Sequence, residues 1–156
     1  MRKYKSCGFR KLVKILAFAK VLSVYGLNKE KFLGNEIIAG FDTMVICDKK
    51  IIQKPRNKQD AVKKILFLSN KTHKVITGIG ILDLKKEKII LDAVETKVTM
   101  KKITKEDART YTSSGEPLGK AGAYAIQGKG KKFVNKVSGD YLNVVGLPLK
   151  RFLQLI

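Results

Sequence analysis

The spacing of apolar residues divides the chain into helical and strand-like segments. Residues 9–25 form an apolar pattern with mostly helical spacing, which predicts a helix ending near Gly26 and Asn28. The apolar positions of this helix are Leu12, Ile15, Leu16, Ala19, Leu22 and Val24. Residues 36–47 are rich in Ile, Val, Phe and Thr and carry little charge, which is typical of a buried strand.

The middle of the chain predicts a helix followed by a long hairpin. Asn57 or Gln59 begins a helix that runs to about Leu68, with Ala61, Ile65 and Leu68 on its apolar face. Residues 72–84 and 88–100 are two strand-like runs around a short charged turn. We expect them to pair as an antiparallel hairpin.

Two shorter helices are predicted in the last third of the chain. Thr104 and Asp107 have the spacing of a capping box, which favours a helix over residues 104–112. Residues 148–156 predict a closing helix with a buried side formed by Leu149, Phe152, Leu153 and Ile156.

Between these two helices, residues 115–148 form a glycine-rich region with polar side chains. Seven of the 13 glycines lie there, and between them stand Glu116, Lys120, Gln127, Asp140 and Asn143. Many turns that carry polar groups favour a chain folded around a small ligand. Glycine-rich surface loops without a ligand are the alternative interpretation.

The size and composition indicate one ordinary globular domain over residues 1–156. The chain is 44% hydrophobic, and its two cysteines, Cys7 and Cys47, do not have the spacing of metal ligands. We therefore expect reduced thiols in a cytoplasmic protein. No stretch of about 18 uncharged apolar residues occurs, so the sequence predicts no membrane span.

The formal charge of +20 suggests a nucleic-acid partner, but the distribution of charge does not favour one. Five of the 33 basic residues are arginine, and the lysines are scattered through every segment. No nucleic-acid-binding motif accompanies them. We expect a solvated lysine surface, with no specific nucleic acid bound and a cleft that attracts polyanions.

Several familiar catalytic motifs are absent from the sequence. His73 is the only histidine, which excludes multi-histidine metal sites and favours a structural position at the start of a strand. A phosphate-binding P-loop would need Gly at Ser114 and Ser or Thr at Ala121. Asp42, by contrast, is a carboxylate inside an apolar strand, where a strand-end position, a metal ion or a lysine partner would make it tolerable.

The order of several short motifs resembles the Maf family of nucleoside triphosphate pyrophosphatases. The glycine-rich motifs are Gly-Glu-Pro-Leu from Gly115, Lys-Ala-Gly-Ala-Tyr from Lys120, Ile-Gln-Gly from Ile126 and Asn-Val-Val-Gly-Leu-Pro from Asn143. The upstream motifs are Gly-Phe-Asp-Thr-Met-Val from Gly40, Lys54-Pro55, Leu68-Ser69 and His-Lys-Val-Ile-Thr-Gly from His73. The likeness extends from about Leu16 to the C-terminus.

This resemblance implies a fold and a reaction. The fold would be an α/β domain of the Maf/ITPase type, with a mixed sheet in two lobes around a nucleotide cleft and without the family's usual first strand. The reaction would be the hydrolysis of dTTP or UTP to the monophosphate and pyrophosphate, assisted by Mg²⁺ or Mn²⁺. The family also implies a homodimer.

The resemblance also assigns roles to residues. Asp42 matches the catalytic acidic residue and would also hold the metal. Thr43 and Gln127 match positions tied to substrate choice, and Lys20 matches a lysine directed at substrate phosphates. The remaining substrate-binding candidates are Lys54, Glu116 and Lys120.

One family motif has no counterpart here. Family members carry a Ser-x-Ser-Pro-Arg-Arg loop after a first strand, whereas residues 1–15 contain no such motif and form an atypical or truncated N-terminus. Arginine grips a phosphate with a planar fork that lysine cannot reproduce. We therefore expect weak turnover, and the alternative function is an inactive homologue that binds nucleotides or nucleic acid.

Overall fold

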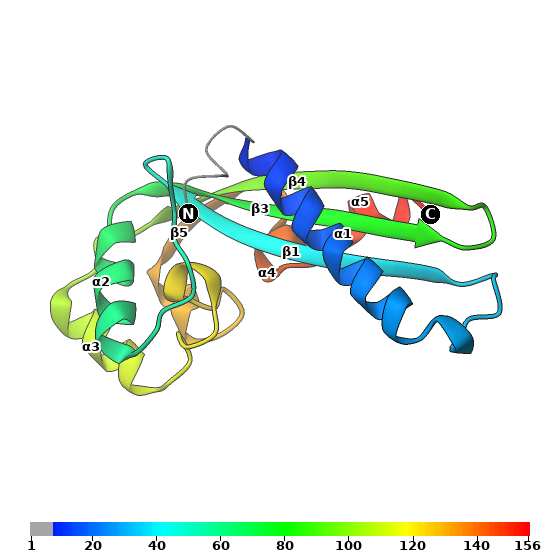
Figure 1. Cartoon of the computed structure of the whole chain (residues 1–156). Coiled ribbons are helices and arrows are strands. Elements are labelled where there is room, and N and C mark those ends of the chain that lie inside the picture. The colour runs from blue at the N-terminus through cyan, green and yellow to red at the C-terminus, as the bar shows by residue number, and fades with distance from the viewer. Residues whose placement is uncertain (1–7) are drawn as a thin grey trace.

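One antiparallel sheet runs the length of the molecule (Figure 1). The computed structural model describes residues 8–156, so the predicted Cys7 thiol lies outside the described residues. The strand order is β2-β1-β3-β4-β5, and all four strand pairs within the described range are antiparallel. The strands are β1 (Ile37–Cys47), β2 (Lys50–Ile51), β3 (Thr72–Asp83), β4 (Lys88–Met100) and β5 (Val134–Ser138). The predicted α/β class is confirmed, but within residues 8–156 the sheet is antiparallel and not mixed as expected.

The hairpin of β3 and β4 forms the long axis of the sheet. The predicted antiparallel hairpin is confirmed, and its register pairs Thr72 with Thr99 at one end and Asp83 with Lys88 at the other. The turn is held by the Asp83 carboxylate, whose Oδ1 accepts a hydrogen bond from the Lys86 amide at 2.9 Å. Strand β1 runs beside β3 as far as the turn of this hairpin, where Ile37 pairs with Asp83 (Figure 1).

Helix α1 (Phe9–Leu27) crosses one face of the sheet, and three strand glycines let it approach closely. A Cβ built on Gly40 would lie 2.5 Å from the Ala17 carbonyl oxygen, and one on Gly78 would lie 2.2 Å from the Val13 carbonyl oxygen. Gly80 faces the backbone of Phe18 in the same way. The helix backbone therefore rests directly on the sheet.

This close approach changes which side of α1 is buried. The buried positions are Leu12, Val13, Ala17 and Val21. The predicted positions Ile15, Leu16, Leu22 and Val24 are exposed instead. Only a narrow stripe of the helix fits against the strand glycines, so most of the apolar positions of the helical pattern lie outside the buried stripe. The helix ends at Leu27 with Asn28 as its cap, so Gly26 lies inside it.

Helices α2 (Lys58–Leu68) and α3 (Lys105–Ser113) pack at one end of the sheet and build the second lobe (Figure 1). The Asn57 side chain accepts from the Asp60 amide at 2.9 Å, and the Thr104–Asp107 capping box is present, so both helix starts are confirmed. The predicted apolar face of α2 is fully buried: Ala61, Ile65 and Leu68.

The glycine-rich region contains structure that the sequence did not predict. It holds the 3₁₀ helices η3 (Ala121–Ala123) and η4 (Lys129–Phe133), strand β5 and helix α4 (Tyr141–Val145). A further 3₁₀ helix, η2 (Lys29–Lys31), follows α1. These elements are three to five residues long, too short to show an apolar period.

The closing helix differs from its prediction. Helix α5 covers Leu149–Leu153, and Leu149, Leu153 and Ile156 are exposed. Phe152 makes the main apolar contact, edge to face with Phe41 at 5.5 Å between ring centroids. Helix α5 lies on a face of the sheet, with Phe152 against Phe41 of β1 and Arg151 paired with Asp92 of β4. Its five residues leave most of its apolar side chains exposed, so the predicted buried face was wrong. Across residues 8–156, no helix combines the length and apolar character needed to cross a membrane.

Candidate active site

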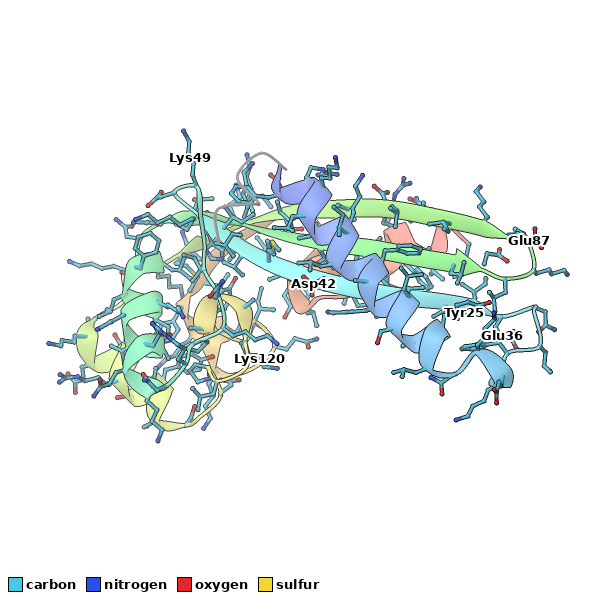
Figure 2. The ribbon with its side chains drawn as sticks, in the orientation of Figure 1. Tyr25, Glu36, Asp42, Lys49, Glu87 and Lys120 are labelled. Carbon is cyan, nitrogen blue, oxygen red and sulfur yellow. The ribbon has the colours of Figure 1, made fainter. Side chains whose placement is uncertain are left out.

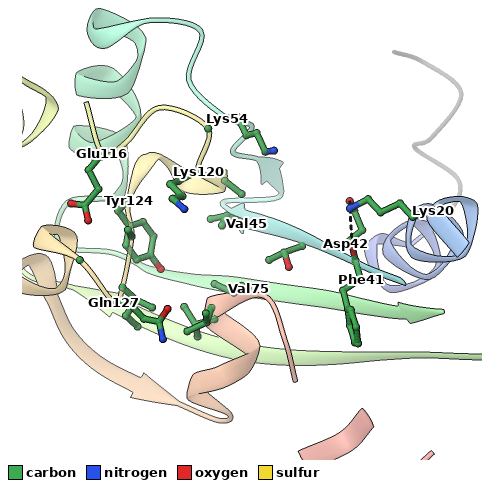
Figure 3. Close-up of a pocket in the computed structure, with 18 residues that line it drawn as sticks. Lys20, Phe41, Asp42, Val45, Lys54, Val75, Glu116, Lys120, Tyr124 and Gln127 are labelled. Carbon is green, nitrogen blue, oxygen red and sulfur yellow. Dashed lines mark hydrogen bonds and ion pairs between the residues drawn. The ribbon is translucent and has the colours of Figure 1, made fainter. Parts of the chain in front are cut away.

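A cavity of about 590 Å³ lies between the two lobes, and all seven predicted site residues line it (Figure 3). They come from five separate parts of the chain: α1, β1, the loop before α2, the loop after α3 and the segment after η3. The residues are Lys20, Asp42, Thr43, Lys54, Glu116, Lys120 and Gln127. The fold thus assembles them into one site, while their individual roles remain predictions.

The cavity is built around an uncovered stretch of strand β1. Strand β2 pairs only with Ile46 and Cys47, so within residues 8–156 the outer edge of β1 has no neighbouring strand before that point. Successive residues of a strand point to opposite faces. Asp42 is opposite Gly78, on the face covered by α1, whereas Thr43 is opposite Thr77, on the face of α4. Both line the cavity because it extends around this edge.

Asp42 is paired with Lys20 from α1. The Lys20 Nζ atom lies 2.7 Å from Asp42 Oδ1 and donates a second hydrogen bond of 2.7 Å to the Phe41 carbonyl (Figure 3). Figure 2 shows where Asp42 lies in the whole molecule. The Asp42 side chain is 22% exposed, so it is neither fully buried nor freely solvated. Of the three explanations for a carboxylate in this strand, the structure supports the lysine partner. The partnership depends on α1 lying close to the sheet.

Two further lysines give the cavity a positive balance. Lys54 and Lys120 are exposed, and neither forms an ion pair within the described residues. Together with Lys20 they face two carboxylates, Asp42 and Glu116. A concave surface with excess positive charge attracts polyanions.

Glu116 is held in place by the chain that follows Gln127. Its Oε1 accepts a hydrogen bond from the Lys129 amide at 3.0 Å, while its Oε2 is buried without a hydrogen-bond partner. One oxygen therefore fastens the Glu116 loop, and the other can accept a donor. Gln127 itself is exposed on the cavity wall.

Tyr124 contributes a buried aromatic wall that sequence reasoning did not select. Its hydroxyl lies 2.8 Å from His73 Nε2, and burial lowers the pKa of His73 to about 4 and raises that of Tyr124. His73 thus stays neutral at physiological pH and fixes the Tyr124 ring. The structure places His73 as the second residue of β3, which confirms the predicted structural position.

A chain of hydrogen bonds behind Thr43 was also missed. Thr43 Oγ1 lies 2.9 Å from Thr77 Oγ1, and Thr77 donates to the Asn143 carbonyl at 3.1 Å. The Asn143 amide donates to the Val75 carbonyl at 3.1 Å and to Thr96 Oγ1 at 3.0 Å. This network joins β1, β3, β4 and α4. The sequence signal was Asn143 among the glycines, but only strand register identifies its partners.

The site has the groups for binding a phosphorylated ligand and taking up a proton, but it is not a preformed metal cage. No group of three or more His, Cys, Asp or Glu side chains that could hold a metal occurs within residues 8–156. A metal here would need oxygen ligands from a bound substrate. Mg²⁺ is often bound in this way, through one or two carboxylates plus substrate phosphates.

Comparison with known proteins agrees with this arrangement. A family model described as "Maf-like protein" matches residues 4–156. A dTTP/UTP pyrophosphatase of Alkaliphilus metalliredigens is 47% identical over 139 residues, which cover 89% of this chain and 70% of the relative. One from Dictyoglomus turgidum is 43% identical over 122 residues, covering 78% and 63%. One from Clostridium botulinum is 46% identical over 117 residues, covering 75% and 60%.

These matches span most of this chain but a smaller share of the relatives. The chain spans about 60 to 70% of the length of the curated relatives it matches. The matched family model nevertheless covers nearly every residue, including all those that line the cavity. The chain therefore belongs to the Maf family.

Proposed function

We propose that this chain hydrolyses dTTP or UTP to the monophosphate and pyrophosphate. The observation that carries the proposal is the gathering of Asp42, three lysines and Gln127 around one cavity. The relatives' name, dTTP/UTP pyrophosphatase, supports the choice of substrate. Nucleoside triphosphates are cytoplasmic metabolites, so we place the activity in the cytoplasm.

Each group has a chemical task in this reaction. Water attacks the triphosphate, the bond between the α and β phosphates breaks, and pyrophosphate leaves. Asp42 accepts the proton of the attacking water, and its carboxylate is 2.7 Å from Lys20, which moves toward a phosphate when substrate binds. Lys54 and Lys120 neutralise the charge that develops on the leaving pyrophosphate.

The residues present fit Mg²⁺ or Mn²⁺ only together with substrate. Asp42 would supply a carboxylate oxygen, and the phosphates would complete the shell, as hard divalent cations prefer. Bound there, the ion would neutralise phosphate charge and assist ionisation of water. Lys20 neutralises Asp42 in the absence of a metal ion. Lys20 and the metal ion would therefore bind this carboxylate alternately.

Replacing Asp42 tests the proposal directly. Asp42→Asn keeps the shape and removes the proton acceptor, so we expect kcat for dTTP to fall by about 10²- to 10⁴-fold. Release of pyrophosphate in the presence of Mg²⁺ measures the rate. Asp48→Asn is the matched control, because Asp48 also pairs with a lysine, Lys71 at 2.9 Å, but does not line the cavity. Equal rates for wild type and Asp42→Asn would exclude Asp42 from the mechanism.

A nucleotide-binding protein with little catalysis is the second candidate function. One observation favours it: within residues 8–156 every cation on the cavity wall is a lysine, and none is an arginine. Tight binding of dTTP without release of pyrophosphate by wild-type protein would establish this function instead.

We also propose that the chain forms the homodimer that the family implies. Analytical sedimentation measures this oligomeric state.

A further inference from the structure

A second cavity, of about 580 Å³, shares Ile126 and Gly128 with the candidate active site. Four of its lining residues are lysines: Lys101, Lys129, Lys131 and Lys132. We call it the lysine pocket. Its volume lies in the range of small-ligand sites, roughly 300–1,000 Å³. None of the proposed catalytic steps uses these lysines.

The backbone brings the four lysines together from two segments. Helix η4 supplies Lys129, Lys131 and Lys132 within a single short turn. Lys101 follows β4, and its amide donates to the Phe133 carbonyl at 2.8 Å, which joins it to the end of η4. The cluster is therefore a consequence of the fold as well as of a lysine-rich sequence.

These charges have no carboxylate partners. Lys20, Lys64, Lys71, Lys74 and Lys86 each form an ion pair, but none of the four lysines of the pocket does so within residues 8–156. The nearby carboxylate of Asp107 accepts a 2.6 Å hydrogen bond from Thr104. Its pKa is lowered mainly by Thr104 and to a smaller degree by Lys132. Four like charges around a hollow repel one another unless an anion joins them.

The floor of the lysine pocket is apolar. Strand β5 pairs Val137 with Val98 and Val134 with Met100, and a bulge between these pairs inserts one extra residue. The bulge puts Val134 and Val137 on one face although they are three residues apart. Tyr141 is 40% exposed, and its hydroxyl donates to the Ile126 carbonyl at 3.3 Å. A flat ring could lie against these side chains.

We propose that the lysine pocket is a second binding site for a mononucleotide, separate from the candidate active site. Its phosphate lies among the lysines, which bind phosphate as point charges. Its base lies against Val134, Val137 and Tyr141, because aromatic side chains stack with bases largely without regard to sequence. The pocket favours one nucleotide over a nucleic-acid strand, since the lysines surround a single hollow.

Calorimetric titration with dTMP tests the site. The active-site cavity is first weakened with Lys20→Gln and Lys54→Gln, so that the remaining binding reports the lysine pocket. In this background, Lys131→Gln with Lys132→Gln should weaken dTMP binding by about tenfold or more, because each lysine contributes a charged hydrogen bond. Thymidine, which lacks the phosphate, should bind the background protein no more tightly than dTMP binds the variant that also carries Lys131→Gln and Lys132→Gln.

The matched control is Lys29→Gln with Lys31→Gln. These lysines are also exposed on a 3₁₀ helix, and their replacement removes the same charge without touching the pocket. Circular dichroism verifies the fold of each variant. The control should bind dTMP like its parent. Equal losses in both double variants, or no loss in either, would overturn the proposal.

Two further measurements separate this site from other functions. An oligo(dT) strand that binds more than tenfold tighter than dTMP, and loses affinity in the Lys131/Lys132 variant, would replace the mononucleotide with nucleic acid. Hydrolysis of dTTP by Lys131→Gln with Lys132→Gln in an otherwise native chain should stay within about twofold of wild type. Failure of dTTP hydrolysis in wild-type protein would contradict the proposed function. The dTMP titration would still test the lysine pocket, because it does not depend on hydrolysis.

Discussion

Replacing Gly78 with alanine tests whether close packing of α1 on the sheet positions the active site. The added Cβ would lie 2.2 Å from the Val13 carbonyl oxygen, 2.4 Å from its carbonyl carbon and 2.8 Å from the Lys14 amide nitrogen. All three are backbone atoms, so no rotamer change relieves the contact. Ordinary contact between such atoms needs about 3.5 Å, and the helix must therefore move by about 1 Å.

This displacement should affect stability and activity separately. Overpacking of a tight interface costs about 1–3 kcal/mol, and we expect Gly78→Ala near the upper end of that range because the obstacle is a helix backbone. Lys20 lies two turns further along α1, so its 2.7 Å contact with Asp42 should lengthen. A displacement of about 1 Å can reduce turnover about 100-fold.

Urea unfolding and dTTP hydrolysis measure the two effects. Gly26→Ala is the control: Gly26 lies in the same helix, and a Cβ there meets no atom within 4 Å. That substitution should stabilise the protein by about 0.5–1 kcal/mol and leave turnover unchanged. If Gly78→Ala unfolds at the same urea concentration as wild type, the helix does not rest on Gly78 as described.

Three further predictions concern Gln127 on the cavity wall and two residues that support wall residues from behind, His73 at Tyr124 and Tyr111 at Ala125. The pKa of His73 falls from 6.5 to about 4 on folding. The folded protein therefore has its full unfolding free energy above pH 6.5, where His73 is neutral in both states, and loses part of it as the pH falls toward 4. Between pH 7.5 and 5.0 wild type should lose about 2 kcal/mol more unfolding free energy than His73→Gln, and equal losses in urea titrations would contradict this. Gln127→Glu should change the ratio of kcat/KM for dTTP to that for other triphosphates by about tenfold, because a mismatched polar group at a base edge costs about 1–3 kcal/mol; an unchanged ratio removes Gln127 from substrate choice. Tyr111→Phe leaves the Ala125 amide, now bound to the Tyr111 hydroxyl at 3.0 Å, without a partner. Thermal unfolding should show a loss of about 1–3 kcal/mol relative to Tyr25→Phe, whose hydroxyl makes no hydrogen bond within residues 8–156, and a similar melting temperature for both would refute the role.

Sequence patterns correctly predicted the elements in which the hydrophobic periodicity and the capping or turn residues indicate the same boundaries. Helix α2 matches its predicted start at Asn57 and its apolar face, because capping and amphipathic spacing both report local energetics. The β3–β4 hairpin was equally clear, since its turn is short and charged. Motif order likewise selected seven residues that the structure brings to one cavity.

The failures come from contacts that no local pattern encodes. The exposed Ile15 and Leu22 of α1 lie off the buried stripe because Gly40, Gly78 and Gly80 admit the helix backbone itself. Nothing in residues 9–25 indicates that three distant glycines will meet them. The Thr43–Thr77 contact likewise depends on the register of β1 against β3, two strands whose pairing the sequence did not predict.

The glycine-rich region shows why motif residues and site residues coincide there. A Cβ on Gly128 would lie 1.4 Å from Glu116 Oε1, so only glycine leaves room for the carboxylate that accepts the Lys129 amide. That single bond joins the loop carrying Lys120 to the segment carrying Gln127. The same segment separates the candidate active site from the lysine pocket, since Ile126 and Gly128 line both. A ligand that shifts Lys129 in one cavity would therefore pull on Glu116 in the other, which gives the two sites a direct physical connection.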